Sequence, residues 1–117
     1  MKIRSLTCFA NYESSRGPDD LRDLGSATRD CAKALMPLGY EIQSLRYATQ
    51  PFAAYLNTDD TANAIKMSLE LEQRAIAAGF LYTSIGPAAS EDDKAMGAIP
   101  PVLAASNSLF ASGQITT

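Results

Sequence analysis

The chain has 117 residues, 46% of them hydrophobic, and a formal net charge of −3. This size and composition are typical of one globular domain, and the acidic balance argues against nucleic-acid binding, which needs a basic surface. The absence of histidine excludes a Ser-His-Asp triad, a Cys-His dyad and any zinc site with a His ligand within the chain.

The distribution of apolar residues and the two cysteines indicate the cellular compartment of the protein. The N-terminal sequence MKIRSLTCFA lacks the long apolar stretch of a signal peptide, and no apolar run reaches the roughly 20 residues that span a bilayer. Cys8 and Cys31 are too few for a disulfide framework and fall on predicted apolar faces, so we expect two free, buried thiols. These features indicate a cytoplasmic protein without a membrane partner.

The first strand and the first helix are the clearest elements. Residues 3–10 carry mixed side chains on both alternating faces, which is typical of a strand covered on both sides in a parallel sheet. A helix is expected to begin at Pro18 and to end before Pro37. Gly25 inside it indicates either close packing of the helix against the sheet or a kink. The apolar stripe of this helix comprises Leu21, Leu24, Thr28, Cys31 and Leu35.

The middle of the chain repeats the pattern of a strand followed by a helix. The strand is predicted over residues 40–48 and the helix over roughly residues 60–78. Ile65, Leu69 and Ile76 recur at helical spacing, so we expect this stripe to face the core.

A proline-containing helical segment follows the next strand. Ser90 and Asp93 resemble a capping box, with aspartate in place of the usual glutamate. Pro100 and Pro101 are expected to divide the segment into two short helices, because proline lacks the backbone N–H and clashes with the preceding turn.

The complete order of predicted elements defines the fold class. A third strand is predicted over residues 80–85, ending at Gly86, and a fourth over residues 108–111. Each connection is long enough to join parallel strands by a right-handed crossover. We therefore predict a single α/β domain over residues 1–117, with about four parallel strands in β-α-β-α-β-α-β order and covering helices. Its last strand is either an edge strand or a point where a larger protein continues.

Four stretches resemble a known family. The opening IRSLTCF, the strand FLYTSIGPA, the segment EDDKAMGAIPPVLAAS and the closing NSLFASGQI are similar to the N-terminal part of the domain of unknown function 711 family. The shared pattern is an Ile-Arg-x-Ile/Leu-Thr start, an acidic loop, an Ile-Pro-x-x-Leu-Ala helix and a strand that ends in small residues. The resemblance spans nearly the whole chain and implies that the chain is the N-terminal part of a longer protein.

The resemblance also implies a fold. That fold is an α/β barrel similar to that of glycyl-radical enzymes such as pyruvate formate-lyase. Radical chemistry is not implied, because the glycyl-radical loop belongs to the C-terminal part of those enzymes. Many relatives carry a cysteine near the closing strand, where this chain has Leu109, Phe110 and Ala111, so no thiol mechanism is carried over. The resemblance implies no activity and no cofactor.

Polar residues directly after the predicted strands form the candidate site, because parallel sheets bind ligands at the carboxyl ends of their strands. Glu13 is the carboxylate of this set and the candidate base or cation contact. Ser84 and Ser112 would donate hydrogen bonds, and Gly86 would allow a ligand to approach the backbone closely. The other ligand-binding candidates are Asn11, Tyr47, Gln50 and Gln114. The competing interpretation is that loops are polar on any surface.

Two arginines inside predicted strands and one acidic run remain. Arg4 and Arg46 could bind an anionic substrate in a barrel lumen, although an ion pair with a carboxylate such as Glu41 is the more ordinary interpretation. Consecutive carboxylates at residues 91–93 stand at a helix start, where the helix dipole favours them, so no metal site is predicted.

Two functions stay open at this point. In the first, the chain belongs to an enzyme-like protein that binds a small polar metabolite at the strand ends, with the reaction and the cofactor unidentified. In the second, it is a non-catalytic binding or assembly module whose exposed sheet edge pairs with further chain or with a second copy.

Overall fold

The computed structural model describes residues 2–114. The strands are β1 (Lys2–Ile3), β2 (Leu6–Phe9), β3 (Glu41–Ile42), β4 (Leu45–Ala48), β5 (Tyr82–Ala88) and β6 (Leu109–Gly113). The helices are α1 (Pro18–Leu35), α2 (Thr61–Ala78) and α3 (Asp93–Ala105), with short 3-10 turns η1 (Ser14–Arg16), η2 (Met36–Leu38) and η3 (Phe52–Ala54).

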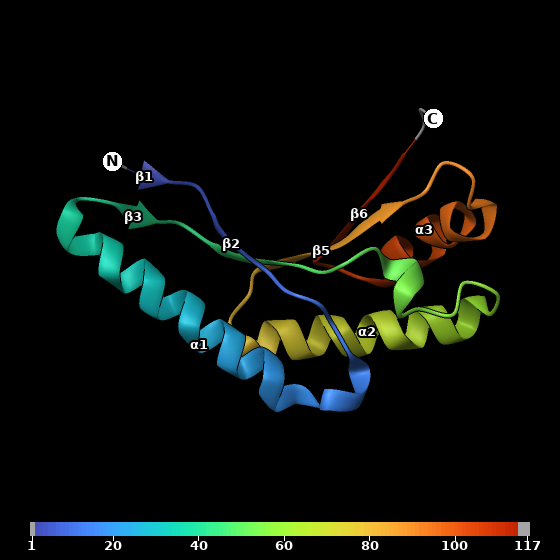
Figure 1. The fold of residues 1–117 in the computed structure, drawn as a ribbon, viewed down its shortest axis with the longest axis horizontal. Helices are drawn as coiled ribbons and strands as arrows, with labels where there is room; N and C mark the ends of the chain where they lie inside the picture. Colours follow the sequence, from blue (N-terminus) through green and yellow to red (C-terminus); the bar gives the residue numbers. More distant parts are fainter. Residues whose placement is uncertain (1, 115–117) are drawn as a thin grey trace.

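The main sheet has four parallel strands in the order β2-β4-β5-β6, so neighbours along the chain are neighbours in space. Strands β1 and β3 form a separate parallel pair at one end of the molecule (Figure 1). The α/β class with parallel strands is thereby confirmed, although there are more strands than the four expected.

The additional strands arise because the first two predicted strands each break in the middle. On one side of the break Gln43 N donates to Ile3 O at 2.9 Å, and on the other Leu6 N donates to Ser44 O at 3.0 Å. The Ser44 hydroxyl bridges the break by donating to Arg4 O at 3.0 Å. The two segments, residues 2–9 and 41–48, therefore stay side by side although the regular β-ladder between them is interrupted.

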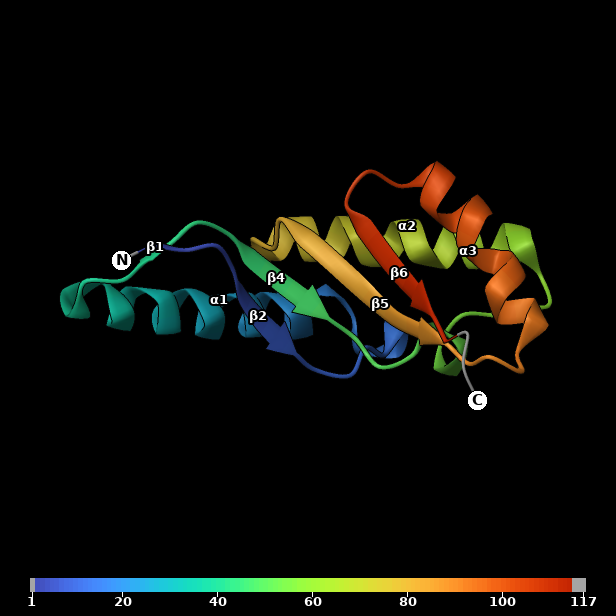
Figure 2. The same cartoon turned by 90° about the horizontal axis from the view of Figure 1, so that it is seen from above.

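All three helices share one core on a single face of the main sheet. Tyr47, Ile85 and Leu109 point from the strands into this core and are at most 6% exposed. Alternate residues point to the other face, where Phe9 is 81% and Phe110 is 52% exposed. Figures 1 and 2 show α1 and α2 beneath the strands, with no described helix over the opposite face. The expectation of a sheet covered on both sides is therefore wrong for this part of the chain.

Close contact between α1 and α2 explains the glycine inside α1. A Cβ at Gly25 would collide with the carbonyl oxygen of Ala78, the last residue of α2. Gly25 thus permits helix–helix packing, rather than the helix–sheet packing expected from the sequence. Arg29, one turn further along α1, donates to the same Ala78 carbonyl at 2.6 Å and so caps the end of α2.

Helix α2 is turned differently from the prediction. Ile76 is 53% exposed and Leu69 is only partly buried, so the predicted stripe is wrong at these two positions, whereas Ile65 packs against the core as expected. The buried face instead carries mostly small residues, which let α2 approach α1, α3 and the sheet closely. Its members are Ala64, Ser68, Leu71, Glu72, Ala75 and Ala78.

Helix α3 runs unbroken through Pro100 and Pro101, contrary to the predicted interruption. Buried Ala98 and Val102 on either side of the prolines anchor both halves in the core. Pro100 itself is exposed, so water can satisfy carbonyl groups that the prolines leave unpaired. The capping box is also wrong: the N-cap is Asp92, whose carboxylate accepts from Ala95 N at 3.0 Å.

Strand β5 continues past the glycine that was expected to end it. A register shift between Ser84 and Pro87 lets the strand resume pairing with β6 as far as Ala88. Gly86 makes this possible with a φ of 80°, a conformation that favours glycine.

Both cysteines are free thiols. Cys8 is partly buried against the core as expected, whereas Cys31 is exposed, which corrects the prediction. The physical reason is that the C-terminal half of α1 runs on beyond the main sheet (Figure 1), so no described element covers its outer side there.

Candidate functional site

The open face of the main sheet has two rows of side chains in register. The first row runs from Thr7 on β2 through Arg46 on β4 to Tyr82 on β5. The second row, one step nearer the carboxyl ends, comprises Phe9, Ala48, Ser84 and Phe110. Two small residues thus lie between two aromatic ones, which produces a trough across the sheet.

This trough contains a hollow of about 350 Å³. Its lining is mostly apolar with a few polar groups, the usual make-up of a small-molecule site. The lining residues are Thr7, Phe9, Arg46, Tyr47, Ala48, Tyr82, Ser84 and Phe110. Figure 2 looks onto this face and shows the four strands in front of α1 and α2.

An aromatic ladder holds the arginine of the open face in place. The Arg46 guanidinium carbon lies 5.2 Å from the centroid of the Tyr82 ring, within cation–π range. The Tyr82 ring in turn meets Phe110 edge-on at 5.2 Å between centroids. These contacts connect β4, β5 and β6 across the floor of the hollow.

Some predicted strand-end residues do come together, but largely to pack against each other. A Cβ at Gly86 would lie 2.9 Å from Gln50 O and 2.8 Å from Pro51 Cα, so the glycine admits the neighbouring chain rather than a ligand. The Gln50 amide clamps the loop after β2, because it accepts from Tyr12 N at 2.7 Å and donates to Tyr12 O at 2.8 Å. Ser112 is exposed and pairs in register with Pro87, and Ser84 lies in the hollow.

The remaining candidates lie elsewhere. Tyr47 is 0% exposed, because its side chain points into the core and stacks on Phe80. Glu13 is exposed and paired with Arg16 at 3.1 Å, in the segment that descends to the helix side of the sheet in Figure 1. The exposed Asn11 and Gln114 follow β2 and β6, and Gln114 N donates to Ala88 O at 2.8 Å. The geometry therefore groups Ser84 with Arg46 rather than with Glu13.

A cluster of tyrosines underlies the carboxyl ends of the strands. The rings of Tyr12 and Tyr55 meet edge-on at 5.3 Å between centroids, and Arg74 donates to the Tyr12 hydroxyl at 3.2 Å. Burial raises the pKa of Tyr55 well above its usual range, and its hydrogen bond with Thr49, 2.7 Å long, lowers it in part. Burial also raises the pKa of Tyr47. Tyr47 and Tyr55 therefore stay neutral at physiological pH and act as packing groups.

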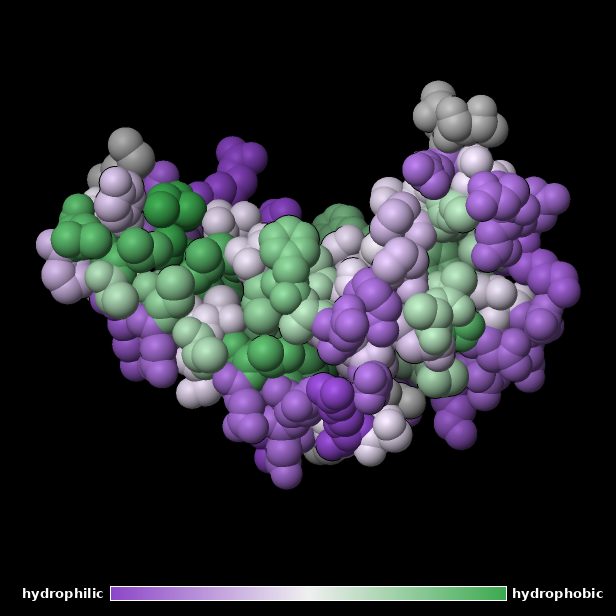
Figure 3. Space-filling model, in the orientation of Figure 1, coloured by the Kyte–Doolittle hydropathy of each residue, from purple (hydrophilic) through white to green (hydrophobic). Residues whose placement is uncertain are grey.

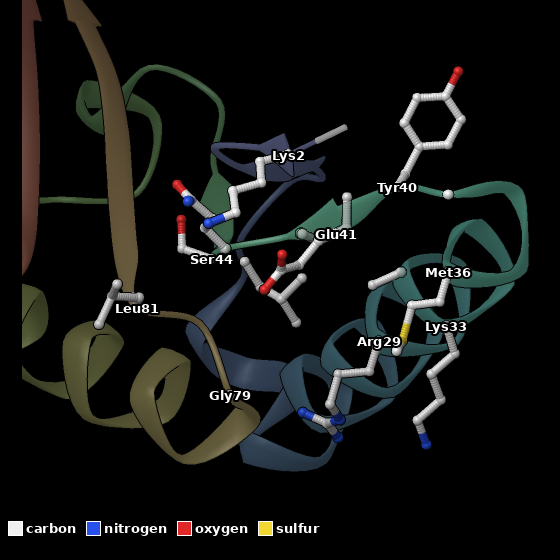
Figure 4. A pocket seen from close by; sticks show the side chains of 14 residues that line it. Lys2, Arg29, Lys33, Met36, Tyr40, Glu41, Ser44, Gly79 and Leu81 are labelled. Carbon is white, nitrogen blue, oxygen red and sulfur yellow. The ribbon is translucent and has the colours of Figure 1, made fainter.

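A larger gap of about 1000 Å³ lies at the other end of the molecule, between the last turns of α1 and the β1–β3 pair (Figure 4). Hydrophobic residues gather at this end (Figure 3), and Met36 and Leu81 at the margin of the gap are 64% and 53% exposed. The gap adjoins the amino ends of β4 and β5, whereas the smaller hollow adjoins the carboxyl ends of β2 and β4. Because parallel sheets bind ligands at carboxyl ends, the smaller hollow is the better candidate for a ligand site.

Sequence reasoning named Arg46 and Ser84 but missed the aromatic residues around them. The signal was the alternation along each strand, which places Phe9, Tyr82 and Phe110 on the face opposite the core. The alternation identifies these aromatic residues only if one face of the sheet is known to be open. The open face is known only from the side on which the helices pack.

The structure gives no indication of a metal centre or a membrane segment in the part of the chain that it describes. Among residues 2–114, no three cysteine or carboxylate side chains gather as a metal-binding group. None of the described helices combines the length and apolar character that a bilayer crossing needs.

Comparison with known proteins gave one finding. The family model described as Uncharacterised ACR (DUF711) matches residues 1–117. No curated protein and no solved structure matches the chain. The match covers all four sequence stretches on which the resemblance was based, and the chain therefore belongs to the DUF711 family.

Proposed function

We propose that this chain forms the floor of a small-molecule site and binds a small polar metabolite on the open face of its sheet, beside the carboxyl ends of β2 and β4. One observation carries the proposal: the hollow of about 350 Å³ between Phe9 and Phe110, with Arg46 and Ser84 inside it. Apolar walls with a few convergent polar groups are the usual features of a ligand pocket.

The arrangement of the elements supports a finer proposal about the fold. Parallel sheets normally have both faces covered, and strands in sequential order with all helices on one side are the arrangement of an α/β barrel. We therefore propose that the four strands are an arc of a barrel like that of pyruvate formate-lyase, with the open face toward the lumen.

Two free thiols fit a reducing compartment such as the cytoplasm.

A metabolite-library thermal-shift screen on the full-length protein tests the proposed site. Ser84→Leu would fill the hollow and should abolish the stabilisation by any ligand that the wild type binds. Ser26→Leu, which adds the same side chain on the exposed side of α1, is the matched control. Glu13→Gln should also respond like the wild type, because Glu13 lies on the helix side and pairs with Arg16. A Ser84→Leu protein that still binds would contradict the proposal.

Assembly is the second candidate function, and the exposed edge of β6 favours it. The outer side of β6 pairs with no described strand, and Phe110 on this strand is 52% exposed. An edge of this kind can add a strand from further chain or from a second copy. In that case the protein should form an oligomer that light scattering detects, and an edge substitution such as Ala111→Pro should reduce its mass.

A further inference from the structure

We propose that the ligand of the open face is a small organic acid, whose carboxylate pairs with Arg46 and whose apolar body lies between Phe9 and Phe110. This inference rests on the proposed function and adds the chemical class of the ligand.

The charge balance of the hollow favours an anion. Arg46 is its cationic lining residue, and no carboxylate lines it. Within the described chain no carboxylate forms an ion pair with Arg46, and its Nε is buried without a hydrogen-bond partner. A partly buried cation without a counter-charge is costly, so an anion that enters the hollow gains a favourable partner.

Aromatic contacts restrict the Arg46 guanidinium. Its carbon lies 5.2 Å from the Tyr82 ring centroid, and Phe110 meets that ring edge-on at 5.2 Å between centroids. A guanidinium held beside an aromatic ring loses rotamer freedom, and its planar fork can donate two N–H groups to one carboxylate. The aromatic ladder therefore pre-orients Arg46 and reduces the entropy lost on binding.

The lining of the hollow favours a carboxylate over a phosphate. The lining offers one positive charge and neither a helix N-terminus nor a glycine-rich loop. A phosphate monoester carries close to two negative charges at neutral pH and is normally held by several donors. A single carboxylate matches the single charge of Arg46.

The space between the two phenylalanines suits the apolar body of such a ligand. Phe9 and Phe110 stand at the two ends of one row, three strand spacings apart, which is about 14 Å between backbones. Ala48 and Ser84 leave room between them, and both phenylalanines are largely exposed. A body about the size of one ring would cover this apolar surface while its carboxylate reaches Arg46 in the adjacent row.

Binding of three matched probes to the full-length protein tests the inference. Phenylacetate carries the carboxylate, phenylacetamide is its neutral analogue, and phenyl phosphate represents the phosphate esters. Dissociation constants are measured by ligand-observed NMR at low salt. We expect the wild type to bind phenylacetate at least about tenfold more tightly than phenylacetamide, which is the effect of one charge-assisted hydrogen bond.

Three variants locate the effect. Arg46→Gln should lose the preference for phenylacetate, and Arg46→Lys should keep part of it, since lysine keeps the charge but lacks the planar fork. Arg22→Gln is the control, because it changes the net charge equally at an exposed position on α1, paired with Asp19. A circular dichroism melt shows that each variant is folded, and if Arg46→Gln does not fold, Arg46→Lys and the wild-type preference decide.

The outcomes separate this inference from the proposed function. Equal binding of phenylacetate and phenylacetamide, or a preference that survives in Arg46→Gln, overturns the carboxylate site. Tighter binding of phenyl phosphate than of phenylacetate overturns the choice of carboxylate over phosphate. If neutral library ligands still bind the wild type and fail to bind Ser84→Leu, the proposed function stands without the inference.

Discussion

The carboxylate of Glu72 on α2 holds the turn that leads into β6. Its Oε2 accepts from Asn107 N at 2.9 Å, from Ser108 N at 2.7 Å and from the Ser108 hydroxyl at 3.0 Å. Because Glu72 is only 6% exposed, removing it leaves donors unpaired in a poorly hydrated place. This side chain therefore determines where the last strand of the sheet begins.

We predict that Glu72→Ala lowers the free energy of unfolding by about 2–4 kcal/mol, because buried donors lose their acceptor. Glu91→Ala removes the same charge at an exposed position and should change it by less than about 0.5 kcal/mol. Urea denaturation of both variants measures the difference. Equal effects would show that the turn does not depend on the carboxylate.

The raised pKa of Tyr55 predicts a loss of stability in alkali. Burial, the largest cause, favours the neutral phenol in the folded protein, whereas tyrosine in the unfolded chain ionises near pH 10. Below about pH 10 both states are protonated and the contribution of Tyr55 is complete; above it the unfolded state loses the proton first, so stability falls as pH rises.

Urea denaturation between neutral pH and about pH 11 checks this prediction. The stability difference between the wild type and Tyr55→Phe should be constant up to about pH 10 and should then shift in favour of the variant, at up to about 1.4 kcal/mol per pH unit. Tyr40→Phe, at a more peripheral tyrosine, is the control. Parallel curves for the wild type and Tyr55→Phe would refute the burial of this phenol.

At the scale of elements, two helical glycines with the same intrinsic cost lie in opposite environments. A Cβ at Gly25 would collide with the Ala78 carbonyl where α1 crosses α2, whereas a Cβ at Gly97 on α3 meets no atom within 4 Å. The same substitution should therefore have opposite effects on stability.

We predict that Gly25→Ala destabilises the protein by about 1–3 kcal/mol through overpacking. Gly97→Ala should stabilise it by up to about 1 kcal/mol, because alanine costs less entropy in a helix. Thermal unfolding of the two variants gives the comparison. A gain of stability in Gly25→Ala would mean that the two helices do not pack closely at this point.

The sequence was sufficient to predict the approximate positions of the helices and the main strands, but not their breaks and continuations or how they pack. The Leu69 stripe of α2 was wrong because spacing finds the large apolar residues, whereas this helix buries small ones such as Ala64 and Ala75 to bring its neighbours close. The unbroken α3 was missed because Pro100 acts against the helix locally, while burial of Ala98 and Val102 maintains it.

At the scale of the whole molecule, the parallel sheet followed from the alternation of strands and helices, whereas the order of its strands and the position of the candidate site did not. Strand ends were the natural place to look, but Gln50 and Gly86 there serve the protein's own packing. The polar residues of the open face were hidden within strands, where mixed faces suggested cover on both sides. Only the packing of all helices on one side distinguishes Arg46 as a candidate site residue.

The exposed Phe110 decides between the two candidate functions, because it belongs to both the hollow and the edge strand. If the open face binds a metabolite, Phe110→Ser should lose the ligand-induced thermal shift and keep the mass of the wild type in light scattering. Leu38→Ser, at an apolar residue that is 70% exposed on η2, should change neither quantity. A lower mass for Phe110→Ser with an unchanged ligand response would instead identify the edge of β6 as an assembly surface, because an apolar side chain on an edge strand is then buried by a partner strand.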